Sequence, residues 1–240
     1  MKMKKLTSVL LVAACALSLV ACGGSGDKKD SSKGGSSSKT AKVIDIDLTN
    51  EEYAFGVDKN QPELLEKTNE FIAKIKSDGT LDEIIKKWTG ESQSSSNSAV
   101  PETTTPAGQK ATPKKSKYSI SSDSSFAPFV FQNGKNKYTG IDMDLIKAIA
   151  KDQGFTIEIN NPGFDAAVSD VQSGHAQGMI AGMTVTDARK ETFDFSEPYY
   201  TANSILAVQE SSKIDSYDDL KGKTVGVKNG TSSQNFLEEN

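Results

Sequence analysis

The pattern of apolar and polar residues divides the chain into two folded stretches separated by low-complexity segments. Residues 23–41 and 92–116 are built from Gly, Ser, Thr, Pro, Lys and other small or polar residues, with almost no large apolar side chain. Such segments cannot bury a core, so we expect both to be flexible linkers. The folded stretches are therefore expected at 42–91 and 117–240.

The first folded stretch begins with a strand-like run and continues as an amphipathic helix. Residues 53–57 (YAFGV) are apolar or small, as in a buried strand. Pro62 stands where the first turn of a helix tolerates proline, and Gly79 supplies a stop. The apolar residues of this helix recur on one face: Leu64, Leu65, Phe71, Ile72 and Ile75.

A second, shorter helix is predicted between Gly79 and Gly90. Thr80 and Glu83 have the spacing of a capping box, and Gly90 provides the end of the helix. Its apolar residues are Ile84, Ile85 and Trp88. One strand and two helices in about 50 residues are marginal as an independent domain. We therefore expect this stretch to pack on another part of the protein.

The second folded stretch alternates between strand-like and helix-like patterns. Strands are expected at 117–122, 155–160, 178–183, 204–209 and 223–230. Helices are expected at 141–154, with Asp142 as N-cap and Gly154 as stop, and at 165–174. Such alternation is typical of an α/β domain with a largely parallel sheet, whose ligands lie beyond the carboxyl ends of the strands.

Arg189 is the only arginine in the chain, and the other basic residues are lysines. It belongs to the third of three strand-end loops, which span 122–129, 161–165 and 181–189. Thr186 is a candidate N-cap, which places Arg189 in the first turn of a helix, where the dipole disfavours a cation. A bound anion would offset that cost through two parallel hydrogen bonds. The alternative is a surface arginine that pairs with Asp187 or Glu191.

The first 22 residues have the anatomy of a secretory signal, with lysines followed by an apolar run. The end of that run, LVAC, resembles the lipobox of bacterial lipoproteins, with Cys22 as the lipidated residue. An ordinary cleavage site and a second lipobox at Cys15 are the alternatives. The chain has 28 basic and 32 acidic residues, and removal of residues 1–21 takes away three of the lysines. The remainder has 25 basic and 32 acidic residues. That balance argues against a nucleic-acid partner.

Four motifs of the second stretch together resemble a known family. They are DSSFAPFVFQNGKNKYTGIDMDLIKAIAKDQG, GFDAAVSDVQSG, IAGMTVTDARKETFDFSEPYY and DDLKGKTVGVKNGTSSQNF. In this order they resemble the type II solute-binding proteins of polar amino-acid ABC importers, and most closely the glutamine-binding proteins. The resemblance implies a periplasmic-binding-protein-like class II fold of two lobes, with lobe one at 117–207 and the start of lobe two at 208–240.

The resemblance also implies a ligand site for a free amino acid. Arg189 would bind the α-carboxylate with help from Gly182 and Thr184. Two aromatic residues, Phe126 and Phe164, would sandwich the side chain of the ligand. Its polar end would meet Asp123, and Lys228, Thr231 and Ser232 would reach in from lobe two. Lys228 opposite Asp123 is similar to the glutamine-binding pattern, and core packing is the alternative for both phenylalanines.

Several other residues are expected to have structural roles. Phe129 is expected in the core, and His175, the sole histidine, is expected to face solvent and to bind no metal. Asp142 and Asp144 are explained by a helix N-terminus and not by acid–base chemistry. Gln177 stands where the resembled family has an aspartate. No cofactor is expected.

The order of the segments departs from the resembled family. Residues 43–90 resemble the carboxyl-terminal end of a binding module, which returns to lobe one. We therefore expect them to dock on 117–207 and to complete lobe one in a circularly permuted order, with 92–116 as the connection. The family residue that binds the α-amino group has no counterpart that the sequence reveals. The 240-residue chain is expected to bind its ligand weakly or not at all.

The sequence thus predicts an extracytoplasmic, lipid-anchored receptor that captures a polar amino acid, with glutamine favoured, for the permease of an ABC importer. A non-functional truncated remnant of a tandem binding protein is one alternative. An enzyme on the same fold, such as a dehydratase or a lytic transglycosylase, is another. A sensor ectodomain would need a transmembrane helix.

Overall fold

The computed structural model describes residues 40–44, 46, 48–90 and 115–239. The predicted signal segment, the proposed lipidation residue Cys22 and almost all of the two predicted linkers lie outside the described residues. No helix within the described ranges is long and apolar enough to cross a membrane.

The helices follow the predicted pattern closely. They are α1 (Pro62–Asp78), α2 (Thr80–Thr89), α3 (Ile141–Gln153), α4 (Phe164–Gln172), α5 (Asp187–Lys190), α6 (Ser232–Glu239) and the 3₁₀ turn η1 (Asp218–Leu220). Gly79, Gly90 and Gly154 end their helices in the left-handed conformation that glycine adopts without steric cost. Pro62 is the first residue of α1, as predicted.

The strands form one five-stranded sheet and three smaller ones. The five-stranded sheet has the order β10-β3-β9-β4-β8 and contains β3 (Gly56–Asp58), β4 (Lys117–Ser121), β8 (Thr156–Asn160), β9 (Gly178–Met179) and β10 (Phe193–Phe195). The smaller sheets contain β1 (Ala41–Ile44), β2 (Glu51–Tyr53), β5 (Ser125–Phe126), β6 (Val130–Gln132), β7 (Tyr138–Thr139), β11 (Tyr200–Ala202) and β12 (Leu206–Gln209).

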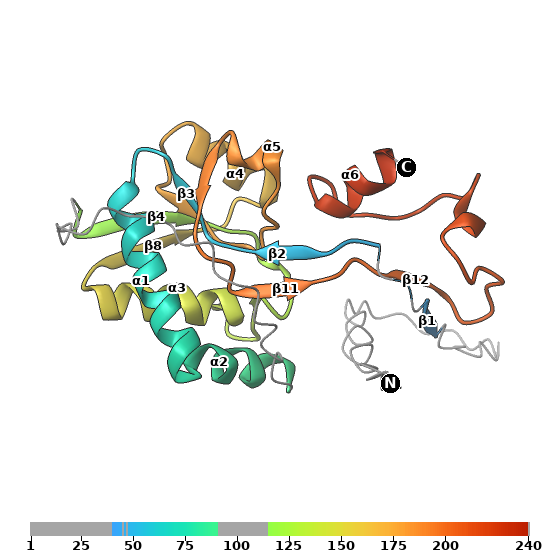
Figure 1. Cartoon of the computed structure of the whole chain (residues 1–240), viewed down its shortest axis with the longest axis horizontal. Helices are drawn as coiled ribbons and strands as arrows, with labels where there is room; N and C mark the ends of the chain where they lie inside the picture. Colours follow the sequence, from blue (N-terminus) through green and yellow to red (C-terminus); the bar gives the residue numbers. More distant parts are fainter. Residues whose placement is uncertain (1–39, 45, 47, 91–114, 240) are drawn as a thin grey trace, which may run out of the picture. The chain divides into compact units, whose positions relative to one another are not determined.

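Strand β3 joins the two folded stretches within one sheet (Figure 1). It lies between β9 and β10 and is antiparallel to both, with Gly56 opposite Met179 on one side and Phe195 on the other. The strands β8, β4 and β9 are mutually parallel. The sheet is therefore mixed, because the one strand from the first stretch runs against its neighbours.

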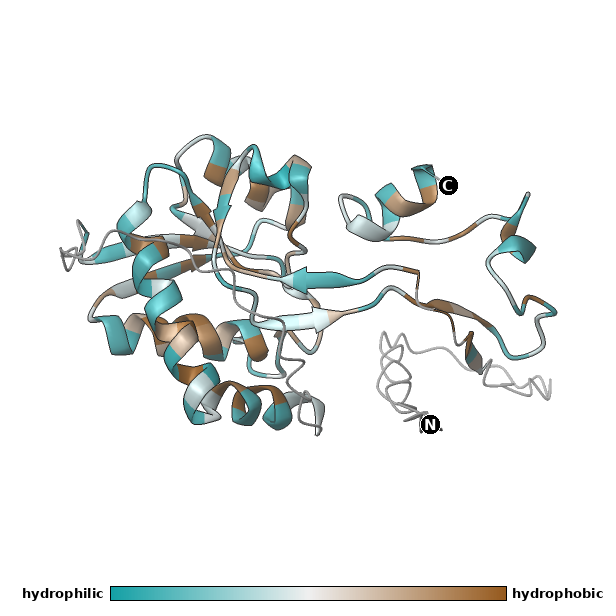
Figure 2. Ribbon diagram, in the orientation of Figure 1, coloured by the Kyte–Doolittle hydropathy of each residue, from teal (hydrophilic) through white to brown (hydrophobic). Residues whose placement is uncertain are grey.

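Helices cover both faces of this sheet (Figure 1). Val57 and Ile120 belong to a core cluster with residues of α1, α2 and α3. Phe193 and Met183 belong to a second cluster with residues of α4. Figure 2 shows apolar residues gathered where α1 and α3 meet. Burial of an apolar side chain such as Val57 stabilises the fold by about 1.5–3 kcal/mol. The first stretch therefore contributes to the shared core.

The helices of the first stretch also make polar contacts with α3. Trp88 donates from Nε1 to Oδ2 of Asp144 over 2.8 Å, and Lys87 lies 2.6 Å from the same oxygen. Lys74 contacts Asp152 near the other end of α3. Asp144 is thus a partner for α2 in addition to being a first-turn acid of α3.

Two antiparallel strand pairs lead away from the five-stranded sheet. In one, Glu51 of β2 stands opposite Ala202 of β11, and Tyr53 opposite Tyr200. In the other, β1 pairs with β12 from Ala41 to Ile44. These pairs lead to the C-terminal segment, which we define as residues 208–239.

Two predicted caps are wrong. Asp142 is not the N-cap of α3: Gly140 occupies that position with φ 126°, and Asp142 is completely buried inside the first turn. Thr80 does not form a capping box with Glu83, because Thr80 is already helical and Gly79 is the N-cap of α2. The amide of Thr80 donates instead to Oδ1 of Asp78 over 2.9 Å.

Three predicted strands are shorter than expected or missing. The run 53–57 is divided between β2 and β3, and 178–183 retains only β9. Residues 223–230 form no strand, although their apolar pattern favours one. A strand needs a hydrogen-bonded partner to be stable, and the sheet pairings of the described residues give this segment none.

Candidate functional site

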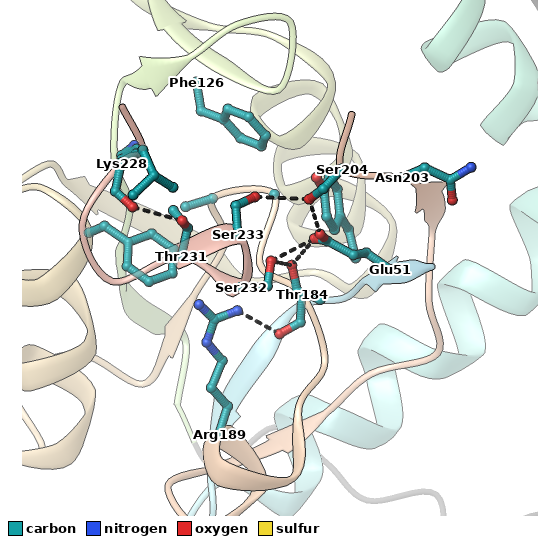
Figure 3. Close-up of a pocket in the computed structure, with 15 residues that line it drawn as sticks. Glu51, Phe126, Thr184, Arg189, Asn203, Ser204, Lys228, Thr231, Ser232 and Ser233 are labelled. Atoms are coloured by element: carbon teal, nitrogen blue, oxygen red, sulfur yellow. Dashed lines mark hydrogen bonds between the residues drawn. The ribbon is translucent and has the colours of Figure 1, made fainter. Parts of the chain in front are cut away.

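A cavity of about 340 Å³ lies between the sheet residues and the C-terminal segment (Figure 3). This volume is within the range of small-molecule pockets. Its lining contains eight of the nine residues that the sequence singled out: Phe126, Phe164, Gly182, Thr184, Arg189, Lys228, Thr231 and Ser232. The ninth, Asp123, is not part of the lining. The other lining residues are Glu51, Tyr53, Ala181, Asn203, Ser204, Val227 and Ser233.

Arg189 is positioned by the short helix α5. As predicted, Thr186 is its N-cap and accepts a hydrogen bond from the amide of Arg189 over 3.2 Å. The guanidinium donates to the carbonyl of Thr184 over 2.7 Å and to the carbonyl of Gly230 over 2.9 Å. These bonds use two of its five N–H donors. Burial lowers the pKa of Arg189, and the charge of Glu51 opposes that effect.

The predicted alternative for Arg189, a surface ion pair, is not what the structure shows. Asp187 pairs with Lys190 over 2.9 Å. The guanidinium of Arg189 instead faces the cavity (Figure 3), and it lies 5.0 Å from the ring centre of Phe164. A half-buried guanidinium held by neutral carbonyls retains its full charge, so it can bind an anion.

Glu51 is a site residue that the sequence analysis missed. It is 5% exposed and accepts hydrogen bonds from four hydroxyls: Thr49, Ser204, Thr184 and Ser232. Burial opposes its ionisation, but these hydroxyl bonds outweigh that effect and hold the pKa of Glu51 below its ordinary value. A carboxylate therefore lines the same cavity as the guanidinium.

The aromatic residues form one wall of the cavity. Phe126 stacks on Phe129 with ring centres 5.1 Å apart, and Phe129 is buried in the core as expected. Gly182 has φ 55°, and a Cβ at that position would collide with the ring of Phe126. A glycine is therefore required for the ring of Phe126 to reach the cavity.

Lys228 connects the C-terminal segment to the first strand-end loop. Its ammonium lies 2.5 Å from Oδ2 of Asp123 and 2.9 Å from the hydroxyl of Ser125, and 5.9 Å from the ring centre of Phe126. Burial raises the pKa of Asp123, but bonds from Lys228 and Ser125 outweigh this and lower it. Asp123 therefore acts on the cavity through Lys228 in this structure.

Asp142 holds the backbone of the cavity wall through a hydrogen bond from Gly182. Its Oδ2 accepts from the amide of Gly182 over 2.6 Å, and its Oδ1 from the hydroxyl of Tyr199 over 2.8 Å. Burial raises the pKa of Asp142 to about 7, although both donors favour the ionised form. This residue, interpreted from the sequence as a helix cap, in fact fixes the position of Gly182.

Two further residues considered in the sequence analysis, His175 and Gln177, do not line the cavity. His175 is exposed, as predicted, with Nδ1 near the hydroxyl of Ser173 at 3.1 Å. Gln177 accepts from the amide of Ser119 over 3.0 Å and so binds to the backbone of β4. Among the described residues, no group of three or more His, Cys, Asp or Glu side chains is placed to hold a metal ion.

The chain belongs to the bacterial extracellular solute-binding proteins, family 3, whose family model matches residues 4–91 and 118–238. The fold is the α/β periplasmic-binding-protein-like class II fold, and the chain covers about half of a type II binding domain.

Curated relatives include amino-acid-binding proteins of ABC transporters. The arginine-binding extracellular protein ArtP of Bacillus subtilis (strain 168) is 38% identical over 117 residues, which are 49% of this chain and 46% of that protein. A probable histidine-binding protein of Neisseria gonorrhoeae is 37% identical over 114 residues, 47% of this chain and 42% of that protein. The chain thus spans about half the length of the curated relatives it matches.

Two solved structures are similar in sequence. The second substrate binding domain of a provisionally named amino acid ABC transporter from Streptococcus pneumoniae Canada MDR_19A is 79% identical, covers 51% of this chain and 56% of that chain, and has a TM-score of 0.38. The Lactococcus lactis GlnP substrate binding domain 2, in an open conformation, is 51% identical and has a TM-score of 0.38. This match covers 54% of the present chain and 56% of that chain.

Proposed function

We propose that the protein is an extracytoplasmic, lipid-anchored receptor that binds a free polar amino acid, glutamine by preference, and delivers it to the permease of an ABC importer. The observation that carries this proposal is the charged pair in one cavity: the guanidinium of Arg189 and the carboxylate of Glu51 both line it. Free α-amino acids are zwitterions, so a cavity lined by one charge of each sign suits them.

The proposed role of Arg189 is to hold the α-carboxylate of the ligand. The ligand would use guanidinium donors beyond the two that already bind the carbonyls of Thr184 and Gly230. The amide of Gly182 donates to Asp142, and this bond fixes the cavity wall beside that carboxylate. Phe126 and Phe164 would cover the aliphatic part of the ligand and exclude water, which strengthens the polar contacts.

The positive charge of Lys228 favours a ligand with a neutral side chain over a ligand with a cationic side chain. Its ammonium lines the cavity and already neutralises Asp123 over 2.5 Å. A ligand guanidinium or imidazolium would meet like charge there, whereas the amide oxygen of glutamine can accept a hydrogen bond from the ammonium. A basic amino acid is the second candidate, because Asp123 is available if Lys228 turns away and because relatives are named for arginine and histidine.

The proposal is tested by a thermal-shift screen of the chain with the twenty L-amino acids. Because we expect weak binding by this chain, the screen uses each amino acid at high concentration. We expect a small stabilisation by L-glutamine, less or none by L-arginine, and loss of the effect in Arg189→Ala. Removing one partner of a buried charge pair costs about 2–5 kcal/mol, a loss of affinity of at least about 30-fold. If Arg189→Ala is stabilised as much as the wild type, the carboxylate assignment is wrong. If no amino acid stabilises the wild type, the chain is a non-functional remnant.

A further inference from the structure

The chain contains two Asn-Gly pairs, at 133–134 and 229–230. Asparagine is one of the thermolabile residues. Before a glycine, its side-chain carbonyl carbon is open to attack by the main-chain nitrogen of that glycine, which has no side chain to hinder the approach. The reaction needs an asparagine side chain that is free to turn, and a main chain that no helix or strand holds. The two pairs differ in these respects.

Asn133 is held by its surroundings. Its Oδ1 accepts from the amide of Lys135 over 3.0 Å and from the amide of Lys137 over 3.1 Å. Its own amide donates to the carbonyl of Lys137 over 3.0 Å. The side chain would have to give up its two bonds in order to turn towards the amide nitrogen of Gly134. The fold therefore protects this pair.

Asn229 has no such restraint. Residues 229 and 230 form a turn outside the helices and strands, and both are exposed. The side chain of Asn229 has no hydrogen-bond partner among the described residues. The amide of Gly230 donates to Oε1 of Gln234 over 2.8 Å, and this exposed bond is what holds the attacking nitrogen. The second pair is therefore the reactive one.

The fold requires glycine at position 230. Its φ is 73°, and an added Cβ would collide with Oδ1 of Asp165. Its carbonyl accepts from Nη2 of Arg189 over 2.9 Å. The next residue, Thr231, donates from its hydroxyl to the carbonyl of Lys228 over 2.7 Å (Figure 3). The reactive pair thus lies in the main chain between Lys228 and the carbonyl that binds Arg189.

We propose that Asn229 is a site of spontaneous deamidation, and that the product releases the C-terminal segment from Arg189. The amide nitrogen of Gly230 loses its proton and bonds to Cγ of Asn229, and ammonia leaves, which closes a cyclic imide. Water then adds to either imide carbonyl and opens the ring. The net reaction takes up one water and releases one ammonia. The products are aspartate and isoaspartate, and in isoaspartate the main chain passes through Cβ.

Isoaspartate changes the length of a span that is fixed at both ends. Lys228 is bound to Asp123 over 2.5 Å, and Gly230 is bound to Arg189 over 2.9 Å. An added methylene group in the main chain between these two contacts cannot leave both in place. The carbonyl contact to Arg189 is the weaker one, because only one of its partners is charged. We therefore expect this contact to break.

The first measurement follows both pairs in one sample. The full chain is incubated at mildly alkaline pH, and peptide mapping by mass spectrometry, with isoaspartyl methyltransferase labelling, measures each product over time. We expect residue 229 to deamidate at least about tenfold faster than residue 133, which corresponds to about 1.4 kcal/mol in activation free energy. A rate at Asn229 no greater than that at Asn133 would overturn the site.

The same measurement in concentrated urea isolates the effect of the fold. Unfolding removes the bonds of Asn133 and leaves two Asn-Gly pairs that are both unrestrained. We expect their deamidation rates to become similar in the unfolded chain. An unchanged difference in urea would show that the neighbouring sequence, and not the structure, sets the rates, and it would overturn the argument from restraint.

Arg189 provides the second measurement, because it is the only arginine and its side-chain Nε–H signal in a ¹H–¹⁵N spectrum is unique. We expect this signal to move as isoaspartate accumulates. It should stay in place in Asn229→Gln, because the longer side chain closes the ring far more slowly. Asn235→Gln, at an exposed asparagine of α6 that no glycine follows, is the matched control and should change with time as the wild type does.

The outcomes separate this inference from the proposed function. An Arg189 signal that stays constant while residue 229 is modified would overturn the release of the C-terminal segment. A signal that moves in step with the modification supports it. Circular dichroism checks the folded fraction of each variant. Neither measurement uses a ligand, so a failure to bind any amino acid would overturn the proposed function and leave this inference standing.

Discussion

Phe55 offers the sharpest test of the shared core, because it belongs to the first stretch but is completely buried among residues of the second. Its ring lies against Gly178, where an added Cβ would collide with it. The backbone of Phe55 is also fixed, since its carbonyl accepts from the amide of Ser196 over 2.9 Å. Replacement of Phe55 by alanine would therefore leave a cavity in the hydrophobic core and not at the surface.

The expected cost follows from the burial. A Phe→Ala change in a core costs about 3–5 kcal/mol, which corresponds to about 6–20 °C in melting temperature for a domain of this size. Calorimetry or circular dichroism of Phe55→Ala measures this loss. Lys59→Ala, in the same segment but exposed, is the matched control and should change the melting temperature little.

Hydrogen exchange shows whether the loss reaches the second stretch. The amide of Ile180, which donates to the carbonyl of Ser121 over 3.2 Å, reports on the junction of β9 and β4. We expect its protection to fall in Phe55→Ala together with that of residues 48–90. Loss of protection confined to residues 48–90, with Ile180 unchanged, would show that the first stretch is a separate unit and would refute the shared core.

Three further predictions concern individual side chains. The folded-state pKa of Asp142 is raised to about 7 from an ordinary 3.8. Asp142 therefore contributes stability that is complete below about pH 4 and is lost as the pH rises through 7, a change on the order of 4 kcal/mol. In denaturant unfolding at a series of pH values, Asp142→Asn should abolish this pH dependence of the free energy of unfolding, and a dependence that persists would contradict the assignment. Gly182→Ala should abolish L-glutamine binding in a titration, because a Cβ would displace Phe126 and φ 55° disfavours alanine; retained affinity would be inconsistent with the described wall. Trp88→Phe should lower the free energy of unfolding by about 0.5–1.5 kcal/mol through loss of the hydrogen bond to Asp144, and an unchanged urea midpoint would show that this bond contributes nothing.

Local signals in the sequence were sufficient to predict the helices, whereas the resemblance to a family supplied most of the residues that line the cavity. Glycine stops at Gly79, Gly90 and Gly154 are local steric requirements, so all three are found as predicted. Arg189 could be singled out because it is the only arginine. Its cap by Thr186 depends on a spacing of three residues, which the sequence also shows.

The features that the sequence did not predict depend on contacts between distant residues. Glu51 enters the site because it meets Thr184, 133 positions away, and nothing in the local pattern of TNEEYAF indicates that contact. Asp142 resembles an N-cap in the sequence, but Gly182 and Tyr199 draw it into the interior. Residues 223–230 have a strand-like pattern, yet no neighbouring strand within the described chain pairs with them.

The most direct test of the account is a titration of the isotopically labelled chain with L-glutamine, followed by two-dimensional ¹H–¹⁵N NMR, which detects even millimolar affinity. The account predicts saturable shifts that are concentrated at Glu51, Gly182, Thr184 and Arg189, and their absence in Arg189→Ala. Shifts that map away from this cavity, or no shifts with any L-amino acid, would contradict the claim that Arg189 and Glu51 form a site for an amino-acid zwitterion.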